Sequence, residues 1–417
     1  MVTVAHYLSA AIFFLVLAGM ILYSREAFTG HYFQPRLLAI THMAALGWGT
    51  CMIFGAYYQL VPVILETELY STKLAWLSWA TLLPGVISLV YAFWVFAPGI
   101  YMQAGALLLL ISIVIFTVDI YLTAAKTKGQ TIQEDFILTA CLFLCFTALL
   151  GTALVFNFTM AFLPQGQLHY LRIHAHLGLA GWFLLTVIGV SSKLVPMFLV
   201  SSYRNDKPLR ASYYLLVTAL VLFMVDSYFY GLNGKTYFIA AIGMTGIGCY
   251  LFYICKCIRS RIKKHIDLPM KHSLLSFILL AAGLICIPFI IYHYLGHNQV
   301  NIKFTFIYGT ILIMGWITAL ILGQTFKTLP FIVWSKRYEH LAGKARIPMP
   351  SDLFKTSLLR LQMISFILFC IGFILGCSFN FPVLIAAGCF ALLIAAVAYI
   401  TNVLIVILHK TKIYDKL

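Results

Sequence analysis

The chain has 417 residues, of which 62% are hydrophobic and only 10% are charged, and its formal net charge is +16. A soluble domain carries roughly a quarter charged residues, so the composition excludes a soluble globular protein. The basic excess indicates contact with membrane lipid and no nucleic-acid partner, because most Lys and Arg residues gather in alternate loops between apolar stretches.

Twelve apolar stretches follow one another along the chain, each long enough to cross a hydrocarbon layer of about 30 Å. The first lacks a preceding basic segment, so we expect it to span the membrane rather than to act as a cleaved signal. These stretches predict an all-α polytopic membrane protein. The expected spans are residues 4–24, 36–63, 73–97, 100–124, 134–160, 170–199, 209–231, 235–258, 271–295, 301–333, 354–377 and 381–409.

The distribution of basic residues predicts the topology. Loops after even-numbered spans and the C-terminal tail hold most of the 28 Lys and Arg residues, among them Lys126, Lys128 and Arg204. Basic loops stay on the cytoplasmic side of a membrane. We therefore expect a multi-pass protein of a bacterial-type inner membrane with both termini in the cytoplasm.

A pattern of Gly, Trp and Pro recurs twice at one constant spacing and predicts three repeats of four spans each. Gly permits close helix approach in lipid and Trp packs beside it, so these positions have a structural interpretation. We expect a single transmembrane domain with repeats 1–134, 135–268 and 269–417, arranged with pseudo-threefold symmetry. The matching positions are Gly47-Trp48, Gly181-Trp182 and Gly315-Trp316, then Gly55, Gly189 and Gly323, then Pro62, Pro196 and Pro330.

Seven of the twelve histidines collect on the predicted outer side. At about 1.5 Å of rise per residue, those in spans 2 and 6 lie roughly 6–10 Å below the outer surface. Ionisable groups at such depth mark functional sites by default. The outer histidines are His31, His42, His169, His174, His176, His293 and His297, whereas His265, His272, His340 and His409 are expected to be solvated on the cytoplasmic side.

His42 and His176 occupy the same position in successive repeats. Two imidazoles from facing helices can ligate the iron of a flat haem from opposite sides. His174 points about 200° away from His176 on its helix, so it can face a second gap, between repeats two and three. His293, which pairs with His297 at i/i+4, could serve that second metal site together with His174.

Cationic side chains lie close to these histidines. Arg36 precedes His42 and Arg172 precedes His176 on the sparsely basic outer side. Either arginine could bind a haem propionate in a bidentate manner, or could reach to the membrane interface. Lys193 and Lys327, one repeat apart near the cytoplasmic end, are expected to extend their ammonium groups to that interface.

The stretch His174-Ala175-His176, followed by a glycine-rich helix that ends in Lys193-Leu194-Val195-Pro196, resembles the His-x-His helix of the haem–copper oxidase catalytic subunit. There the first histidine binds the high-spin haem and the second the low-spin haem. The segment from Thr41-His42 to Pro62 is similar to the corresponding helices of cbb3-type oxidases and nitric oxide reductases. That superfamily has twelve spans in three pseudo-threefold arcs, with its haems toward the outer face.

Departures from the oxidase pattern point to a divergent relative, closer to the NnrS family of haem- and copper-containing membrane proteins associated with nitric oxide tolerance. The His-x-His helix lies in the second repeat here, whereas the third has Tyr308-Gly309-Thr310, and no His-His dipeptide supplies the usual copper ligands. The resemblance implies a haem b, a second haem or copper, a quinol or cytochrome c as redox partner, and association with respiratory-complex subunits.

Three functions stay open from the sequence. The first is a haem protein for electron transfer or for handling nitric oxide or oxygen, an oxidoreductase if it is an enzyme. The second is a transporter or channel with a histidine-lined path. The third is a cofactor-free accessory subunit of a respiratory complex.

Overall fold

The computed structural model describes residues 1–127, 129–297, 302–411 and 415–416, so Lys128 of the predicted topology lies outside the described residues. Within these ranges, twelve helices are long and apolar enough to cross a membrane. The predicted all-α, polytopic membrane fold is therefore confirmed.

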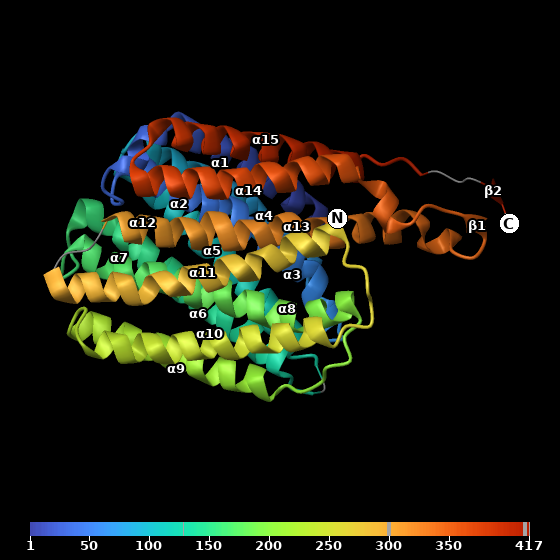
Figure 1. Cartoon of the computed structure of the whole chain (residues 1–417), viewed down its shortest axis with the longest axis horizontal. Helices are drawn as coiled ribbons and strands as arrows, with labels where there is room; N and C mark the ends of the chain where they lie inside the picture. Colours follow the sequence, from blue (N-terminus) through green and yellow to red (C-terminus); the bar gives the residue numbers. More distant parts are fainter. Residues whose placement is uncertain (128, 298–301, 412–414, 417) are drawn as a thin grey trace. The chain divides into compact units, whose positions relative to one another are not determined.

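The twelve spans follow the predicted ones closely (Figure 1). The first six are α1 (Val2–Tyr23), α2–η2–α3 (Pro35–His42, Met43–Thr50, Cys51–Ile64), α4 (Thr72–Trp94), α5 (Ile100–Ala124), α6 (Ile132–Met160) and α7–η3–α8 (Gln167–His176, Leu177–Leu184, Leu185–Leu199). The last six are α9 (Lys207–Phe229), α10 (Lys235–Arg259), α11 (Leu268–His297), α12–η4–α13–η5 (Ile302–Thr310, Ile311–Ile317, Thr318–Tyr338, Glu339–Leu341), α14 (Thr356–Phe379) and α15 (Pro382–Ile407).

Short elements connect or follow the spans. The short 3₁₀ segments η1 (Arg25–Thr29) and η6 (Pro350–Leu353) lie in loops, and β1 (Ala345–Arg346) pairs antiparallel with β2 (Asp415–Lys416). Ser71 and Thr131 begin α4 and α6 by accepting a hydrogen bond from the backbone N–H three residues later. Such caps satisfy backbone donors that a helix end leaves without partners.

The helices group into two compact units. Unit 1 comprises Met1–Ala56, Asp267–Ala281 and Gly309–Leu417, and unit 2 comprises Tyr57–Ile266 and Ala282–Tyr308. The expected single domain and its repeat boundaries after residues 134 and 268 stay predictions.

In unit 1, α14 and α15 lie side by side (Figure 1) and approach closely at glycines. A Cβ atom added at Gly376 would lie 2.7 Å from the backbone N of Ile385, and one added at Gly388 would lie 2.8 Å from that of Phe373. Small residues let helix backbones meet where lipid supplies no hydrophobic drive between helices.

Unit 2 has a close contact at a glycine in each of two helix hairpins. A Cβ atom at Gly105 of α5 would lie 2.7 Å from the backbone N of Leu89 in α4. One added at Gly246 of α10 would lie 2.9 Å from Leu216 Cγ in α9. Each hairpin thus has a close contact at a glycine, with the backbone of α4 in one and with a leucine side chain of α9 in the other.

The second helix of each predicted repeat carries a π-helical segment at the same repeat position. The segments η2, η3 and η4 begin at Met43, Leu177 and Ile311, which are spaced as evenly as the recurring tryptophans. Each segment contains one of those tryptophans, and all three indole rings are fully buried. This recurrence supports the threefold repeat with an observation that the sequence pattern does not contain.

A further repeat-equivalent contact joins the second helix of each predicted repeat to an aromatic ring on a neighbouring helix. Ser191 shares a hydrogen bond with Tyr250 at 2.6 Å in unit 2, and Thr325 does so with Tyr399 at 3.0 Å in unit 1. At the equivalent place in the first repeat, Tyr57 packs against Phe116 with ring centroids 5.5 Å apart. The neighbouring helix therefore supplies an aromatic ring at this position in all three repeats, whereas the second helix carries Tyr, Ser or Thr.

We expect Gly376→Ala to destabilise the protein by about 1–3 kcal/mol, because the added methyl group forces α14 away from α15. Gly19→Ala is the control, since no atom outside its own helix turn lies within 4 Å of the added Cβ, and Ala favours a helix by about 0.8–1 kcal/mol over Gly. Thermal unfolding of both variants in one detergent measures the difference. Equal stability of the two variants would contradict the close approach.

Candidate functional site

His42 is the last residue of α2, directly before the π-helical segment η2. Its side chain is half-buried, and the ring Nδ1 lies 2.7 Å from the backbone oxygen of Leu38, one turn earlier. A carbonyl oxygen can only accept, so Nδ1 carries the proton. Nε2 of the neutral ring then carries the lone pair that a metal ion needs.

His176 repeats this arrangement in unit 2. It ends α7 directly before η3, and its Nδ1 donates to the backbone oxygen of Arg172 at 2.9 Å. The two accepting residues, Leu38 and Arg172, are separated along the chain by the same interval as the two histidines. The two units therefore hold repeat-equivalent imidazoles in the same tautomer and by the same bond.

The local fold explains why these rings adopt one orientation. A histidine can donate to the carbonyl four residues earlier only when its ring points back toward the N-terminus of its helix. This hydrogen bond removes most of the rotational freedom of the side chain. Each ring is followed by a π-helical stretch, a distortion that is frequent at functional sites. The third repeat has Thr310 at this position and so offers no imidazole.

His174 points away from His176, as the helical spacing predicts. Its Nδ1 donates to the backbone oxygen of Thr147 in α6 at 3.0 Å, while the ring of His176 lies 4.4 Å from that of Phe223 in α9. Gly151 leaves the room that His174 uses, since a Cβ atom there would lie 2.7 Å from Cε1 of the imidazole. His174 thus packs on α6 of its own repeat.

His293 pairs with His297 at the end of α11. The two rings are stacked with centroids 4.4 Å apart, and His297 Nδ1 donates to the backbone oxygen of His293 at 3.2 Å. Among the residues that the structure describes, no three His, Cys, Asp or Glu side chains gather in a way that could hold a metal ion. The second metal site at His174 and His293 stays a prediction.

The two candidate arginines differ in their surroundings. Arg36 is exposed, with its guanidinium carbon 5.5 Å above the ring of Tyr23. Arg172 is half-buried, and its Nη1 is buried without a hydrogen-bonding partner in the described part of the chain. A buried guanidinium nitrogen of this kind favours an anionic partner.

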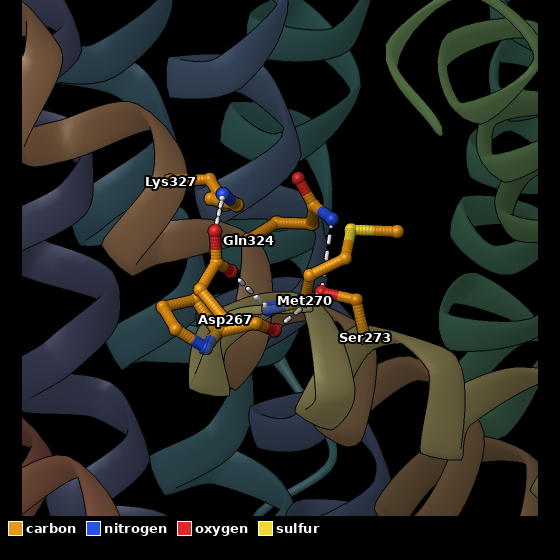
Figure 2. Close-up of polar contacts among 6 residues, drawn as sticks. Asp267, Met270, Ser273, Gln324 and Lys327 are labelled. Atoms are coloured by element: carbon orange, nitrogen blue, oxygen red, sulfur yellow. Dashed lines mark hydrogen bonds and ion pairs between the residues drawn. The ribbon is translucent and has the colours of Figure 1, made fainter. Parts of the chain in front are cut away.

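Two expectations for the cytoplasmic side were wrong. His265 and His340 are exposed as predicted, but His272 is fully buried in α11. Lys327 does not extend to an interface: its ammonium lies 2.5 Å from Oδ2 of Asp267 in unit 1 (Figure 2). The available signal for His272 was its position inside the expected span 271–295.

No family model and no curated protein matches the sequence. A cryo-EM structure described as a heme-copper terminal oxidase dimer is similar to the chain, with a TM-score of 0.71 over 99% of this chain and 85% of that one. The fold resembles that of a haem–copper terminal oxidase.

Sequence identity to that oxidase is 12%, so the similarity concerns the fold alone. The resemblance to the haem–copper oxidases is confirmed at this level. The closer likeness to cbb3-type oxidases, nitric oxide reductases or the NnrS family stays a prediction.

We expect Lys327→Met to lower the free energy of unfolding by about 1–3 kcal/mol, because it removes the charged partner of a carboxylate whose side chain is only 33% exposed. The control is Lys193→Met, whose ammonium lies 3.8 Å from Glu66 with both side chains largely exposed. An exposed pair contributes at most about 1 kcal/mol. Chemical denaturation of both variants measures the difference, and a larger loss for Lys193→Met would contradict this assignment.

Proposed function

We propose that the protein is a haem-binding integral membrane protein of the haem–copper oxidase superfamily, with His42 and His176 as the axial ligands of a b-type haem. The observation that carries the proposal is the hydrogen bond from Nδ1 to the carbonyl one turn earlier, made at repeat-equivalent positions in both units.

The donor chemistry fits haem iron. A neutral imidazole that presents Nε2 is the usual nitrogen ligand of haem. Ligating histidines commonly donate their other N–H to a backbone carbonyl, which sets the tautomer and the ring orientation. Leu38 and Arg172 would provide those two carbonyls.

Arg172 would also bind a propionate. Its buried Nη1 has no hydrogen-bonding partner among the described atoms, and a carboxylate would satisfy it. Arg36 would make a weaker contact of the same kind, because it is exposed to solvent.

When bound, haem supplies a reversible one-electron change at iron. The role that follows is electron transfer or the handling of nitric oxide or oxygen, with a quinol or cytochrome c as redox partner and with respiratory-complex subunits as neighbours. A second haem or copper at His174 and His293 belongs to the same proposal. The charge distribution supports a bacterial-type inner membrane and cytoplasmic termini.

The purified protein should show a Soret band with bis-imidazole character. His42→Ala and His176→Ala should each abolish that band, because one imidazole cannot hold low-spin iron from both sides. Absorption and electron paramagnetic resonance spectra of the two variants measure this, with His31→Ala as a matched control for an exposed histidine on the same predicted side.

Folding is checked by size-exclusion chromatography and circular dichroism. Added imidazole should restore the band in His176→Gly, which distinguishes a lost ligand from a lost fold. Unchanged spectra in both alanine variants would overturn the ligand assignment.

We expect Arg172→Gln to weaken haem retention roughly ten- to hundredfold while leaving the Soret position unchanged, because a charge-assisted hydrogen bond contributes about 1.5–3 kcal/mol. Arg36→Gln should have a much smaller effect. Transfer of haem to an excess of an apo-globin acceptor measures retention. Equal retention in wild type and Arg172→Gln would remove this arginine from the site.

A further inference from the structure

Unit 1 contains a buried polar group of side chains that the proposed haem site does not use. His272 of α11 and Gln362 of α14 are both 0% exposed. Neither ring nitrogen of His272 has a hydrogen-bonding partner among the described protein atoms, and the same holds for the side-chain oxygens of Gln324 and Gln362. We name His272, Gln324 and Gln362 the internal polar site.

The three side chains come from three helices that meet in this unit. The ring of His272 lies 5.4 Å from that of Phe366 in α14, and Gln362 is one helical turn before Phe366. Gln362 Nε2 donates to the backbone oxygen of Leu322 in α13 at 3.4 Å. His272 and Gln362 therefore share the region where α11, α13 and α14 converge.

Gln324 joins the site from α13. Its Nε2 donates to Ser273 Oγ in α11 at 2.9 Å (Figure 2). At the preceding residue, Gly323, an added Cβ atom would lie 2.7 Å from the backbone oxygen of Pro269, so the two helices touch there. The Gln324 oxygen is thus held beside α11, where no described protein atom donates to it.

A partly exposed ion pair lies beside the site. Lys327, three residues after Gln324 in α13, binds Asp267, whose other oxygen accepts the backbone N–H of Met270 at 3.1 Å and begins α11 (Figure 2). The Lys327 and Asp267 side chains are 15% and 33% exposed. Polar groups thus continue from the internal polar site to a charged pair that solvent reaches.

The hydrogen bonds that the internal polar site lacks indicate what kind of ligand it would bind. A neutral imidazole requires one acceptor and one donor, and an amide oxygen requires donors. A cation could satisfy the oxygens but not the imidazole N–H, whereas water both donates and accepts. Buried polar atoms that lack protein partners are normally bonded to ordered water.

We propose that the internal polar site binds a cluster of water molecules that enters from the Asp267–Lys327 end. This part of the membrane-spanning bundle is then hydrated rather than dry. The proposal does not depend on haem ligation, since it concerns residues remote in sequence from His42 and His176.

Hydroxyl-radical footprinting of the full chain in lipid nanodiscs tests this proposal, because radicals formed from bound water modify buried side chains beside it. His272, Phe366 and Met270, which are 0%, 0% and 1% exposed, should be modified. Phe14 and Met102 are the matched controls, both 0% exposed, and should not be modified. Rates at His272 and Phe366 as low as at Phe14 would overturn the proposal.

A variant distinguishes modification by bound water from modification during transient opening of the helices. The double substitution His272→Leu and Gln362→Leu removes the polar groups that hold the water, so modification of Phe366 should be lost. His265→Leu, at an exposed residue just before α11, should leave it unchanged. Modification of Phe366 at the wild-type rate in the folded double variant would contradict water binding at these residues.

Discussion

One hydrogen bond, made twice, determines what the candidate site can do. The Nδ1 atoms of His42 and His176 donate to carbonyl oxygens one turn earlier in their helices. Because a carbonyl can only accept, the bond requires a proton on Nδ1 of each ring and sets the ring's orientation. The resulting Nε2 lone pair makes both residues candidates for metal ligands, whereas a freely rotating histidine would have to lose that freedom on binding.

Within each unit the helices pack closely at glycines. Glycine contacts at Gly376 and Gly105 bring helix backbones together within each unit, and Gly246 packs against the side chain of Leu216. At Gly151 the absence of a side chain makes room for a histidine, since the imidazole of His174 occupies the volume that a side chain would fill. Glycine in this protein therefore provides both helix contact and space for functional groups.

The polar side chains in the interior of unit 1 differ in whether they have protein partners. Asp267 and Lys327 satisfy each other, and Thr325 and Tyr399 do the same. His272, Gln324 and Gln362 leave atoms without protein partners in the described part of the chain. An interior with satisfied pairs beside unsatisfied atoms is consistent with a place where water takes part in the structure.

Hydropathy is a property of a linear chain, so it was enough to predict the membrane class and the twelve spans. The three repeats, and with them the equivalence of His42 with His176, stay predictions from the spacing. The spacing also predicted that His174 points away from His176, since helical periodicity is local. The burial of His272, the pairing of Lys327 with Asp267 and the packing of His174 on α6 emerged only from the folded chain. Those outcomes depend on which residues of distant segments become neighbours, and a linear pattern carries no information about such contacts.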